Sequence, residues 1–342
     1  MLPARPLGKT GIPVTILGFG GAPLGDLFER LDEGKAIGTV EAAHRSGMTL
    51  FDTSPHYGNG LSELRFGAAL RRFPRDSYVL CTKVGRRMDP RLPGGSVGGP
   101  GFAGGVPHGS VVDYSYDGVM RSFEQSLLRL GLDRIDILLL HDVDVWTHGP
   151  EMADERFREA MEGGYKALHE LRGQGVIKAL GLGLNEADTT VRFIKAGDFD
   201  CVLLAGRYSL LHQDALDEFL PLAEQKGIGV ILGGIFNSGI LATGARPGAH
   251  FNYRPAPPDV MERVARIERV CEAHGVPIAT AALHFALGAP AVASVILGGV
   301  SPEEVQRNVA AVQTPVPGAL WGDLKDAGLL PAAVPVPSQD SF

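Results

Sequence analysis

Short apolar runs alternate with longer segments of helical spacing along most of the chain. The runs are rich in Leu, Ile and Val, as in strands that are buried on both faces of a sheet. Between them, apolar residues recur every three or four positions, as at Val119, Phe123 and Leu127, which predicts helices. The predicted strands cover residues 16–20, 48–52, 78–83, 135–141, 177–183, 201–206, 229–234 and 294–299.

Eight strand-and-helix units in one chain favour an α/β fold, a closed (β/α)8 TIM barrel that forms a single domain over residues 1–330. The rival is a doubly wound dinucleotide fold, whose phosphate fingerprint needs three spaced glycines after a strand. After the first run, Pro23 stands where the third glycine should be, and proline would obstruct the close helix approach there. The barrel is therefore the better prediction.

Two segments interrupt the alternation. Residues 86–116 are dense in glycine and have little periodicity, which predicts a long functional or mobile loop after the third strand. Beyond residue 314 prolines recur around a short amphipathic piece at Trp321 and Leu324, which forms a C-terminal extension. We expect the last part, residues 331–342, to be a poorly ordered tail.

Composition narrows the class of partner. The chain has 342 residues, 44% of them apolar, and a formal net charge of −7, without a run of basic residues. It lacks the charge pattern for nucleic acid or an anionic membrane, so small molecules are the expected ligands. No signal peptide and no apolar run near the ~18 residues of a membrane span are visible, and we expect a soluble cytoplasmic protein. Cys81, Cys201 and Cys271 lie in apolar stretches and are expected to be buried thiols without chemistry.

Polar residues stand at the ends of three neighbouring predicted strands. Asp52 ends the second, Lys83 the third and His141 the fourth, and Tyr57 lies in the loop that follows the second. Individually they have ordinary explanations: a capping aspartate, a solvated lysine, a core histidine. Because a barrel gathers the carboxyl ends of its strands at one rim, where catalytic groups collect, we expect them to surround a common volume.

Together these four groups can perform general acid/base chemistry. An ammonium ion beside a phenol favours phenolate, so Lys83 should lower the pKa of Tyr57. A carboxylate at Asp52 would hold the lysine charged, and a neutral imidazole at His141 would orient a carbonyl or hydroxyl oxygen. The set suits proton exchange with a substrate oxygen while hydride moves to or from the attached carbon, and it therefore requires a hydride carrier.

A metal-dependent barrel hydrolase is the competing enzyme class. Asp52, His56, His141 and Asp142 could serve as ligands, but the HxH pair common on a first barrel strand is missing. Lys83 would also oppose the charge of a metal ion. We predict no metal.

Four phrases in order along the chain resemble those of the aldo-keto reductases: FDTSPHYGNGLSE at 51–63, the strand-ending CTKVG, RSFEQSLLRLGLDRIDILLLHD at 121–142, and GVIKALGLGLNE at 175–186. This resemblance covers about residues 6–308. It implies a barrel in which Tyr57 exchanges the proton and Asp52, Lys83 and His141 complete a tetrad.

Further phrases resemble the aldose dehydrogenase branch of that family, namely DYSYDGVMRS, LLHDVDVWTHG, LLAGRYSLL and FNSGILATG. They imply oxidation of an aldose such as L-fucose, D-arabinose or L-galactose at C1 to the lactone. The alternatives are a pyridoxal 4-dehydrogenase or a general aldehyde or ketone reductase of the same family. A non-catalytic nicotinamide-binding sensor is the alternative of another class, although the complete tetrad favours an enzyme.

The resemblance also implies cofactor contacts. Asn185 would bind the nicotinamide carboxamide and Asp52 the nicotinamide ribose. Three positions depart from the family pattern: Leu184 replaces a serine, Ala205 a glutamine and Gly233 an aromatic residue. The remaining implied contacts are Gly21, Phe236, Asn237, Ser238, Gly298, Gly299, Glu304 and Asn308, of which Phe236, Asn237 and Ser238 would line the pyrophosphate and Asn308 would contact the adenine.

The last strand and helix bear on the choice of nicotinamide. By the resemblance, NADP-dependent relatives bind the 2′-phosphate with a lysine and an arginine, whose places hold Gly298 and Glu304. A carboxylate repels phosphate and accepts a hydrogen bond from a free ribose hydroxyl, so NAD is the expected cofactor, with NADP possible through Arg307. Alternatively, Glu304 belongs to a capping box that begins at Ser301.

The expected substrate contacts are Tyr57, His141 and Trp146. His148 follows Trp146, and the glycine-rich segment adds Phe102 and His108. Aromatic faces beside hydrogen-bonding groups suit a sugar ring, and a pyridine ring equally. Trp146 can also simply close the barrel rim.

Overall fold

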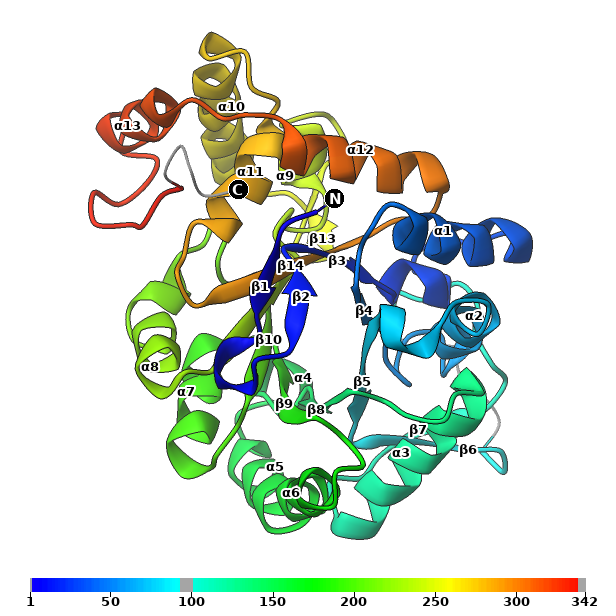
Figure 1. Cartoon of the computed structure of the whole chain (residues 1–342). Coiled ribbons are helices and arrows are strands. Elements are labelled where there is room, and N and C mark those ends of the chain that lie inside the picture. The colour runs from blue at the N-terminus through cyan, green and yellow to red at the C-terminus, as the bar shows by residue number, and fades with distance from the viewer. Residues whose placement is uncertain (1, 93–100, 338–342) are drawn as a thin grey trace.

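A closed barrel of eight parallel strands forms the centre of the computed structural model, which describes residues 2–92 and 101–337 (Figure 1). Each strand matches a predicted run to within two residues at either end. Val295 of the last strand pairs with Leu17 of the first, which closes the sheet and excludes the doubly wound alternative. The barrel strands in order are β3 (Leu17–Gly20), β4 (Leu50–Asp52), β5 (Val79–Val84), β8 (Ile137–His141), β9 (Ala179–Leu184), β10 (Cys201–Ala205), β11 (Gly229–Gly233) and β14 (Val292–Gly298).

Helices surround the barrel as an outer ring (Figure 1). The predicted spacing is confirmed in the helix over Tyr116–Leu130, where Val119 and Phe123 are buried and Ser115 caps the N-terminus through the Gly118 N–H. The helices of the ring are α1 (Glu33–Arg45), α2 (Leu61–Leu70), α3 (Tyr116–Leu130), α5 (Ala153–Glu159), α6 (Tyr165–Gly173), α7 (Ala187–Ala196), α8 (Phe219–Lys226), α10 (Pro258–Ala273), α11 (Ile278–Leu287) and α12 (Pro302–Gln313).

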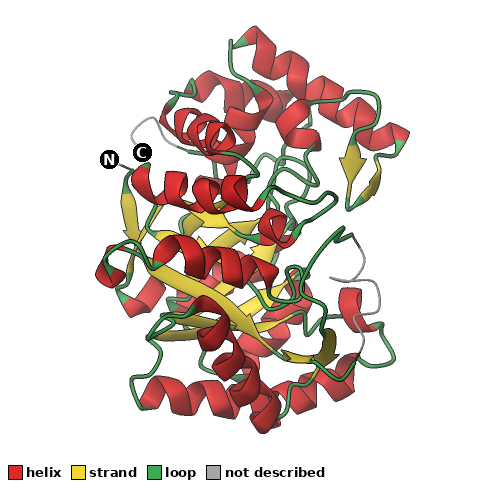
Figure 2. Ribbon diagram, turned by 90° about the vertical axis from the view of Figure 1, so that its right-hand side faces the viewer, coloured by secondary structure: helices red, strands yellow, loops and turns green. Residues whose placement is uncertain are grey.

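An N-terminal hairpin closes one end of the barrel. Its strands, β1 (Ala4–Pro6) and β2 (Pro13–Thr15), were not predicted, because each contains a proline and neither stands out as an apolar run. Leu7, Ile12 and Val14 from this hairpin join the apolar cluster inside the barrel. The side view places the N-terminus at this end and the long loops at the other (Figure 2). The open end is therefore the one to which the barrel strands point their carboxyl termini.

The glycine-rich segment contains a second unpredicted hairpin. Strands β6 (Arg86–Asp89) and β7 (Gly109–Val112) pair in antiparallel fashion, and residues 93–100 lie outside the described residues. The described part of the segment is tied to neighbouring loops, since the Ala103 N–H donates to Asp26 O and the Val106 N–H donates to Gly58 O. A two-residue pair, β12 (His250–Phe251) with β13 (Arg254–Pro255), follows β11 and the short α9 (Ile240–Thr243).

The C-terminal extension packs against the barrel. The amphipathic piece is a helix, α13 (Gly318–Asp326), in which Trp321 and Leu324 are buried as expected. Within the segment expected to be a poorly ordered tail, Val334 is buried, and Lys325 Nζ donates to the Val334 carbonyl at 2.9 Å. The first part of that segment is thus packed, and residues 338–342 lie outside the described residues.

The three cysteines are buried free thiols, as predicted. Among the described residues no single helix is long and apolar enough to cross a membrane; only α10 and α11 taken together reach that length, and they meet at 94°.

Candidate active site

The structure brings Asp52, Lys83, His141 and Tyr57 together at the open end of the barrel. Asp52 and His141 are the last residues of β4 and β8, and Lys83 lies next to last in β5. These strands are neighbours in the sheet, so their ends meet. Tyr57 comes from the loop after β4, which turns back because the Tyr57 N–H donates to Ser54 O.

A buried ion pair forms the base of the site. Lys83 Nζ lies 2.8 Å from both carboxylate oxygens of Asp52 and donates to the Thr53 carbonyl at 2.8 Å. Burial alone would lower the pKa of Lys83, but the Asp52 carboxylate, followed by Tyr57, outweighs it and holds the pKa above its usual value. The lysine is therefore charged, and its ammonium bonds to both carboxylate oxygens of Asp52.

The Lys83 ammonium lies 5.0 Å from the centre of the Tyr57 ring, so the predicted neighbourhood of cation and phenol is confirmed. The predicted consequence is wrong in its net direction. Burial raises the pKa of Tyr57 above its ordinary value, and the opposing influence of Lys83 does not cancel it; Asp52 and Asp142 raise it further. Tyr57 is therefore a protonated phenol at neutral pH, ready to donate a proton.

His141 faces Tyr57 with its ring nearly perpendicular, at 88° and a centroid distance of 6.1 Å. Burial, and after it the charges of Lys83 and Arg86, hold the pKa of His141 well below its usual value, so the imidazole is neutral. Its Nε2 lies 3.3 Å from Asp142 Oδ1, and its Nδ1 lies 3.2 Å from Ser54 Oγ. Because a carboxylate only accepts, this arrangement favours the tautomer with hydrogen on Nε2, and Ser54 then donates to Nδ1.

Asn185 immediately follows β9 on the same rim. Its Nδ2 donates to Asp142 Oδ1 at 3.1 Å and to Asp144 Oδ2 at 3.0 Å, and its backbone N–H also donates to Asp144 Oδ2. Within residues 2–92 and 101–337 no group donates a hydrogen bond to the Asn185 Oδ1. The two aspartates therefore set the orientation of the amide and leave its oxygen as an available acceptor.

Asp142 and Asp144 are site residues whose positioning role the sequence did not indicate. Asp144 was not singled out from the sequence, and in the structure it also caps the short α4 (Val145–His148) through the Thr147 N–H. Asp142 was considered only as a metal ligand. The available signal was their position in the phrase HDVD, directly after a strand that ends in a candidate catalytic residue.

A small cavity of about 50 Å³ lies beside Asn185, between the loops after β10 and β11. Ser238 lines it, and its Oγ accepts a hydrogen bond from the Tyr253 N–H at 2.9 Å, which leaves the hydroxyl hydrogen for another acceptor. Arg207 lines it too. Asn237 also faces the cavity, but its amide oxygen already accepts from Ser209 Oγ at 2.6 Å. Ala205, which replaces the family glutamine, belongs to the lining, whereas Phe236 is partly buried beside the hydrophobic core.

Two of the glycines expected at the cofactor site have a packing explanation. A Cβ at Gly21 would lie 2.6 Å from Ser62 Oγ, and one at Gly298 would lie 2.6 Å from Pro23 Cγ. Gly233 is different, because a Cβ there would meet only ordinary contacts, the nearest at 3.4 Å to Leu203. The surroundings of the backbone therefore do not explain why this position holds glycine and not a larger residue.

The start of α12 carries half of the predicted capping box, and the glutamate bonds to the residue before Ser301. Ser301 Oγ accepts from the Glu304 N–H at 3.3 Å, and Glu304 Oε2 accepts from the Val300 N–H at 2.9 Å. Arg307 lies 3.7 Å from the other Glu304 oxygen. Glu304 therefore caps its helix here, while Gly299 packs beside it and Asn308 is half-buried one turn further on.

Aromatic side chains gather above Tyr57 and His141. Phe102 stacks on Tyr57 at a centroid distance of 6.4 Å and 27°, and His56 lies 5.6 Å from Phe102 edge-on. Trp146 on α4 is 52% exposed, and the Arg207 guanidinium lies 5.7 Å from its ring centre. Sequence reasoning did not single out His56 as a substrate contact.

The two other histidines expected near the substrate, His148 and His108, form hydrogen bonds with neighbouring loops. His148 Nε2 lies 3.0 Å from the Tyr114 hydroxyl, and the backbone carbonyl of His108 accepts from Asn59 Nδ2.

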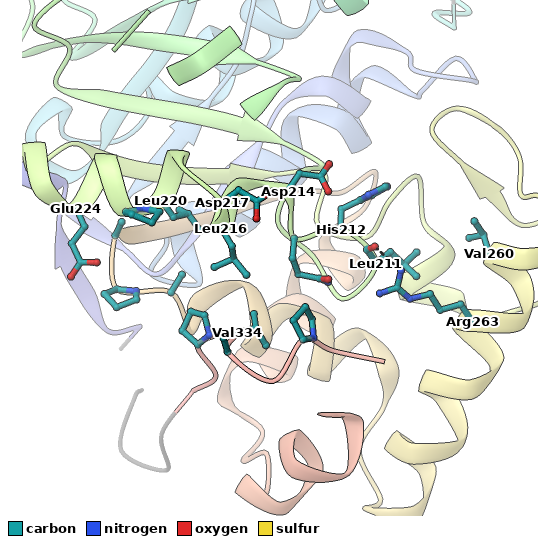
Figure 3. Close-up of a pocket in the computed structure, with 18 of the residues that line it drawn as sticks. Leu211, His212, Asp214, Leu216, Asp217, Leu220, Glu224, Val260, Arg263 and Val334 are labelled. Atoms are coloured by element: carbon teal, nitrogen blue, oxygen red, sulfur yellow. Dashed lines mark hydrogen bonds between the residues drawn. The ribbon is translucent and has the colours of Figure 1, made fainter. Parts of the chain in front are cut away.

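A larger cavity of about 1230 Å³ lies elsewhere, between α8, α10 and the C-terminal segment (Figure 3). Leu216, Leu220, Val260 and Val334 line it together with Arg263. None of the residues around Lys83 and Asp52 borders it. Its size therefore does not make it the candidate active site, whose residues lie at the barrel rim.

Comparison with known proteins identifies relatives along nearly the whole chain. The model of the Aldo/keto reductase family matches residues 16–327. The pyridoxal 4-dehydrogenase of Microbacterium luteolum is 41% identical over 95% of this chain and 97% of its own length. The D-threo-aldose 1-dehydrogenase of a Pseudomonas species is 37% identical over 94% and 96%. Among solved structures, the aldo-keto reductase AKR11C1 of Bacillus halodurans, in its holo form, superimposes with a TM-score of 0.76 and 26% identity over the full length of both chains.

Proposed function

The chain belongs to the aldo/keto reductase family, and from that premise we propose that it oxidises a cyclic aldose at C1 to the lactone, with Tyr57 exchanging the proton. The observation that carries the proposal is the buried Lys83–Asp52 pair beneath a phenol and a neutral imidazole that face one another. That combination supports proton exchange at one oxygen and offers no nucleophile for hydrolysis.

The roles follow from the charges of the side chains. Tyr57 donates a proton to the substrate oxygen in reduction and removes one in oxidation. The hydrogen on His141 Nε2 donates to the same oxygen and orients it. Lys83 opposes the effect of burial on the phenol, and Asp52 keeps Lys83 charged and in place. His141, being neutral, adds no charge that would compete with Lys83.

The donor set at the rim fits a nicotinamide dinucleotide, which when bound supplies or accepts the hydride. Asn185 Oδ1 is an acceptor suited to the amide hydrogens of a carboxamide, and Asp52 stands where the family binds the nicotinamide ribose. The Ser238 hydroxyl and the Arg207 guanidinium are donors suited to a pyrophosphate. The loops that carry Ser238 and Tyr253 are joined by the hydrogen bond from the Tyr253 N–H to Ser238 Oγ, and we expect them to move apart when the dinucleotide enters.

We propose NAD as the preferred dinucleotide, with NADP as the alternative. By resemblance to the family, Glu304 takes the place of an arginine that binds the 2′-phosphate of NADP, and its carboxylate would repel that phosphate. Arg307, one turn further, is the group through which NADP would bind.

Pyridoxal is the second candidate substrate, favoured by the 41% identity to a pyridoxal 4-dehydrogenase. The two candidates share a functional group. An aldose closes to a cyclic hemiacetal, and pyridoxal does so through the hydroxymethyl group next to its aldehyde. Oxidation of either hemiacetal carbon gives a lactone. Phe102, His56 and Trp146 offer aromatic faces for a sugar ring or a pyridine ring.

Reduction of nicotinamide, followed by its absorbance, tests the proposal across L-fucose, D-arabinose, L-galactose and pyridoxal, each with NAD and with NADP. We expect turnover with at least one aldose and a preference for NAD. Turnover with pyridoxal alone would select the second candidate. Tight dinucleotide binding without turnover of any hemiacetal or simple aldehyde would instead indicate a non-catalytic sensor.

A further inference from the structure

Asp142 occupies the point where the candidate substrate and cofactor sides of the rim meet. It directly follows His141, and its side chain is 13% exposed. Its Oδ1 lies 3.3 Å from His141 Nε2 and accepts from Asn185 Nδ2 at 3.1 Å. Its Oδ2 accepts from an Arg86 guanidinium nitrogen at 3.1 Å. Each carboxylate oxygen has two lone pairs, so Asp142 can accept a further hydrogen bond.

The backbone at Asp142 has a φ of +53°, a left-handed conformation that residues other than glycine seldom adopt. Aspartate and asparagine tolerate it best, and such residues cluster at active sites. The conformation is held because the Asp142 N–H donates to Gly183 O at 2.9 Å. This turn keeps the carboxylate next to His141, where a strand continuing straight would carry it away.

Arg86 pairs with Asp142 and still has an unused hydrogen-bond donor. Its side chain is 12% exposed, and within the described residues its Nε–H is buried without an acceptor. Its charge, second to burial, contributes to holding the pKa of His56 at about 4 and also lowers that of His141. The next residue of β6, Arg87, pairs with Asp113 and Asp89 instead. Successive strand residues point to opposite faces, so the two arginines lie on opposite sides of β6, and of the two it is Arg86 that pairs with Asp142.

We propose that Arg86 and Asp142 together recognise a hydroxyl group on a carbon adjacent to the reacting one. This inference deepens the proposed oxidation of a hydroxylated hemiacetal and rests on it for the identity of the substrate. A hydroxyl can donate to the Asp142 carboxylate and accept from the Arg86 guanidinium at the same time, so the pair complements both of its hydrogen-bonding capacities.

The distances at His141 support this geometry. The reacting oxygen must accept from His141 Nε2, and Asp142 Oδ1 is only 3.3 Å from that nitrogen. Oxygens on neighbouring carbons lie within hydrogen-bond distance of each other, so a hydroxyl beside the reacting oxygen reaches the carboxylate. The same hydroxyl can then donate to the Asp142 carboxylate, which lies beside the reacting oxygen.

A substrate without that hydroxyl leaves the buried carboxylate and guanidinium less well hydrogen-bonded in the complex. Sites built to hydrogen-bond a hydroxyl discriminate strongly against analogues that lack it. Because Arg86 and Asp142 still pair with each other, we expect a moderate preference, about 10–100-fold in kcat/KM. The pair thus selects hydroxylated substrates over simple aldehydes.

The experiment compares substrates that differ only in this hydroxyl. Reduction of 2-hydroxypropanal and of propanal is measured with NADH and NADPH, and oxidation of an aldose and of its 2-deoxy analogue is measured with NAD. The wild-type protein should favour the hydroxylated member of each pair by about 10–100-fold in kcat/KM. In Asp142→Asn and in Arg86→Gln this ratio should fall to between one and about three, mainly through loss of the hydroxylated substrate.

Arg87→Gln is the matched control on the same strand, and it should keep the wild-type ratio. Asp144→Asn is a second comparison, because Asp144 also supports Asn185, while within the described residues no hydrogen bond or ion pair joins it to His141. This variant should weaken cofactor binding, measured by fluorescence titration. It should keep the wild-type ratio of kcat/KM between the paired substrates. Equal kcat/KM for the paired substrates in the wild type would overturn the proposal. An equal fall for both substrates in the Asp142 and Arg86 variants would also overturn it, because that result describes a purely structural ion pair.

The aldehyde pair separates this inference from the proposed function. If no aldose is oxidised but 2-hydroxypropanal is still preferred over propanal in reduction, the assignment of the physiological substrate fails and the hydroxyl recognition stands. If an aldose is oxidised as fast as its 2-deoxy analogue, the proposed function stands and the hydroxyl recognition fails.

Discussion

The two halves of the barrel rim are built on different principles. At the ends of β4, β5 and β8, buried polar groups bind one another: Lys83 to Asp52, and His141 to Ser54. Around β10 and β11, the corresponding places hold Ala205 and Gly233. The first half has its geometry fixed before any ligand arrives. The second half has small residues at its strand ends, and its polar side chains, Arg207, Asn237 and Ser238, come from the loops that follow.

This difference shows for which residues the side-chain chemistry alone indicates the role. Charged groups at Asp52 and Lys83 are costly to bury unless they pair, so their roles follow from each other. An alanine or glycine carries no such constraint. Asn185 joins the two halves, because carboxylates of the loop after β8 orient an amide at the end of β9.

Replacing Lys83 should have the largest effect on the preformed half. In Lys83→Met the Asp52 carboxylate is left buried without its partner, and we expect a loss of about 3–5 kcal/mol in the free energy of unfolding, measured by denaturant titration. Turnover should fall by about 10²–10⁴-fold. The double variant Lys83→Met/Asp52→Leu should recover most of the stability without recovering turnover. Recovery of both would show that the pair serves folding only.

The pH dependence of the two directions tests the protonation states in the same half. The pKa of Tyr57 lies above its ordinary value of 10, so the phenolate fraction below that value rises about tenfold per pH unit. The kcat/KM for oxidation should therefore climb between about pH 6 and 9 without levelling, while reduction stays nearly constant, because the phenol remains protonated. The pKa of His141 lies below 6.5, so no acid limb should appear near that value. A plateau in oxidation that begins near pH 7 would contradict the raised pKa of Tyr57.

Asn185→Ala tests the connection between the halves. Loss of the free amide oxygen should weaken dinucleotide binding by about tenfold, the equivalent of one good hydrogen bond. The variant should leave the environment of Tyr57 unchanged, so the pH profile should keep its shape. Fluorescence titration of NAD and NADH gives the affinities. An unaltered dissociation constant would place the carboxamide elsewhere.

Glu304→Arg addresses the cofactor half and should have the smallest effect. We expect the ratio of NADP to NAD preference to rise about fivefold, from removal of one repulsive charge and addition of an attractive one. Because Glu304 caps the Val300 N–H, the variant should also lose about 1 kcal/mol of stability. Glu304→Gln is the control that removes the charge and keeps a capping oxygen. A cofactor ratio unaltered in both variants would mean that Glu304 only caps its helix.

The sequence predicted the barrel because each strand is a distinct apolar run and each helix has a clear period. The hairpins at residues 4–15 and 86–112 were missed, since their strands contain proline, glycine or charged residues and do not stand out as apolar runs. The candidate tetrad was identified because its charged members stand at strand ends. The net pKa shift of Tyr57 was not, because the cost of burial depends on how closely the loops after β4 and β5 cover the phenol, which spacing along the chain does not reveal.

Asp142 illustrates the same limit. From the sequence it was one of several acidic residues after β8, and only the left-handed turn at its backbone places it against His141. Glu304 is the opposite case, since the capping interaction suggested by SPEE is present in the structure.

The most direct test of the central claim is a measurement on Tyr57→Phe. This change removes the exchanging hydroxyl and keeps the ring that packs against Phe102. With the best hemiacetal substrate, turnover should fall by about 10²–10⁴-fold, while the dissociation constant for the dinucleotide changes by less than about threefold. Turnover within a few-fold of the wild type, or loss of dinucleotide binding together with turnover, would contradict the assignment of Tyr57 as the proton-exchanging group.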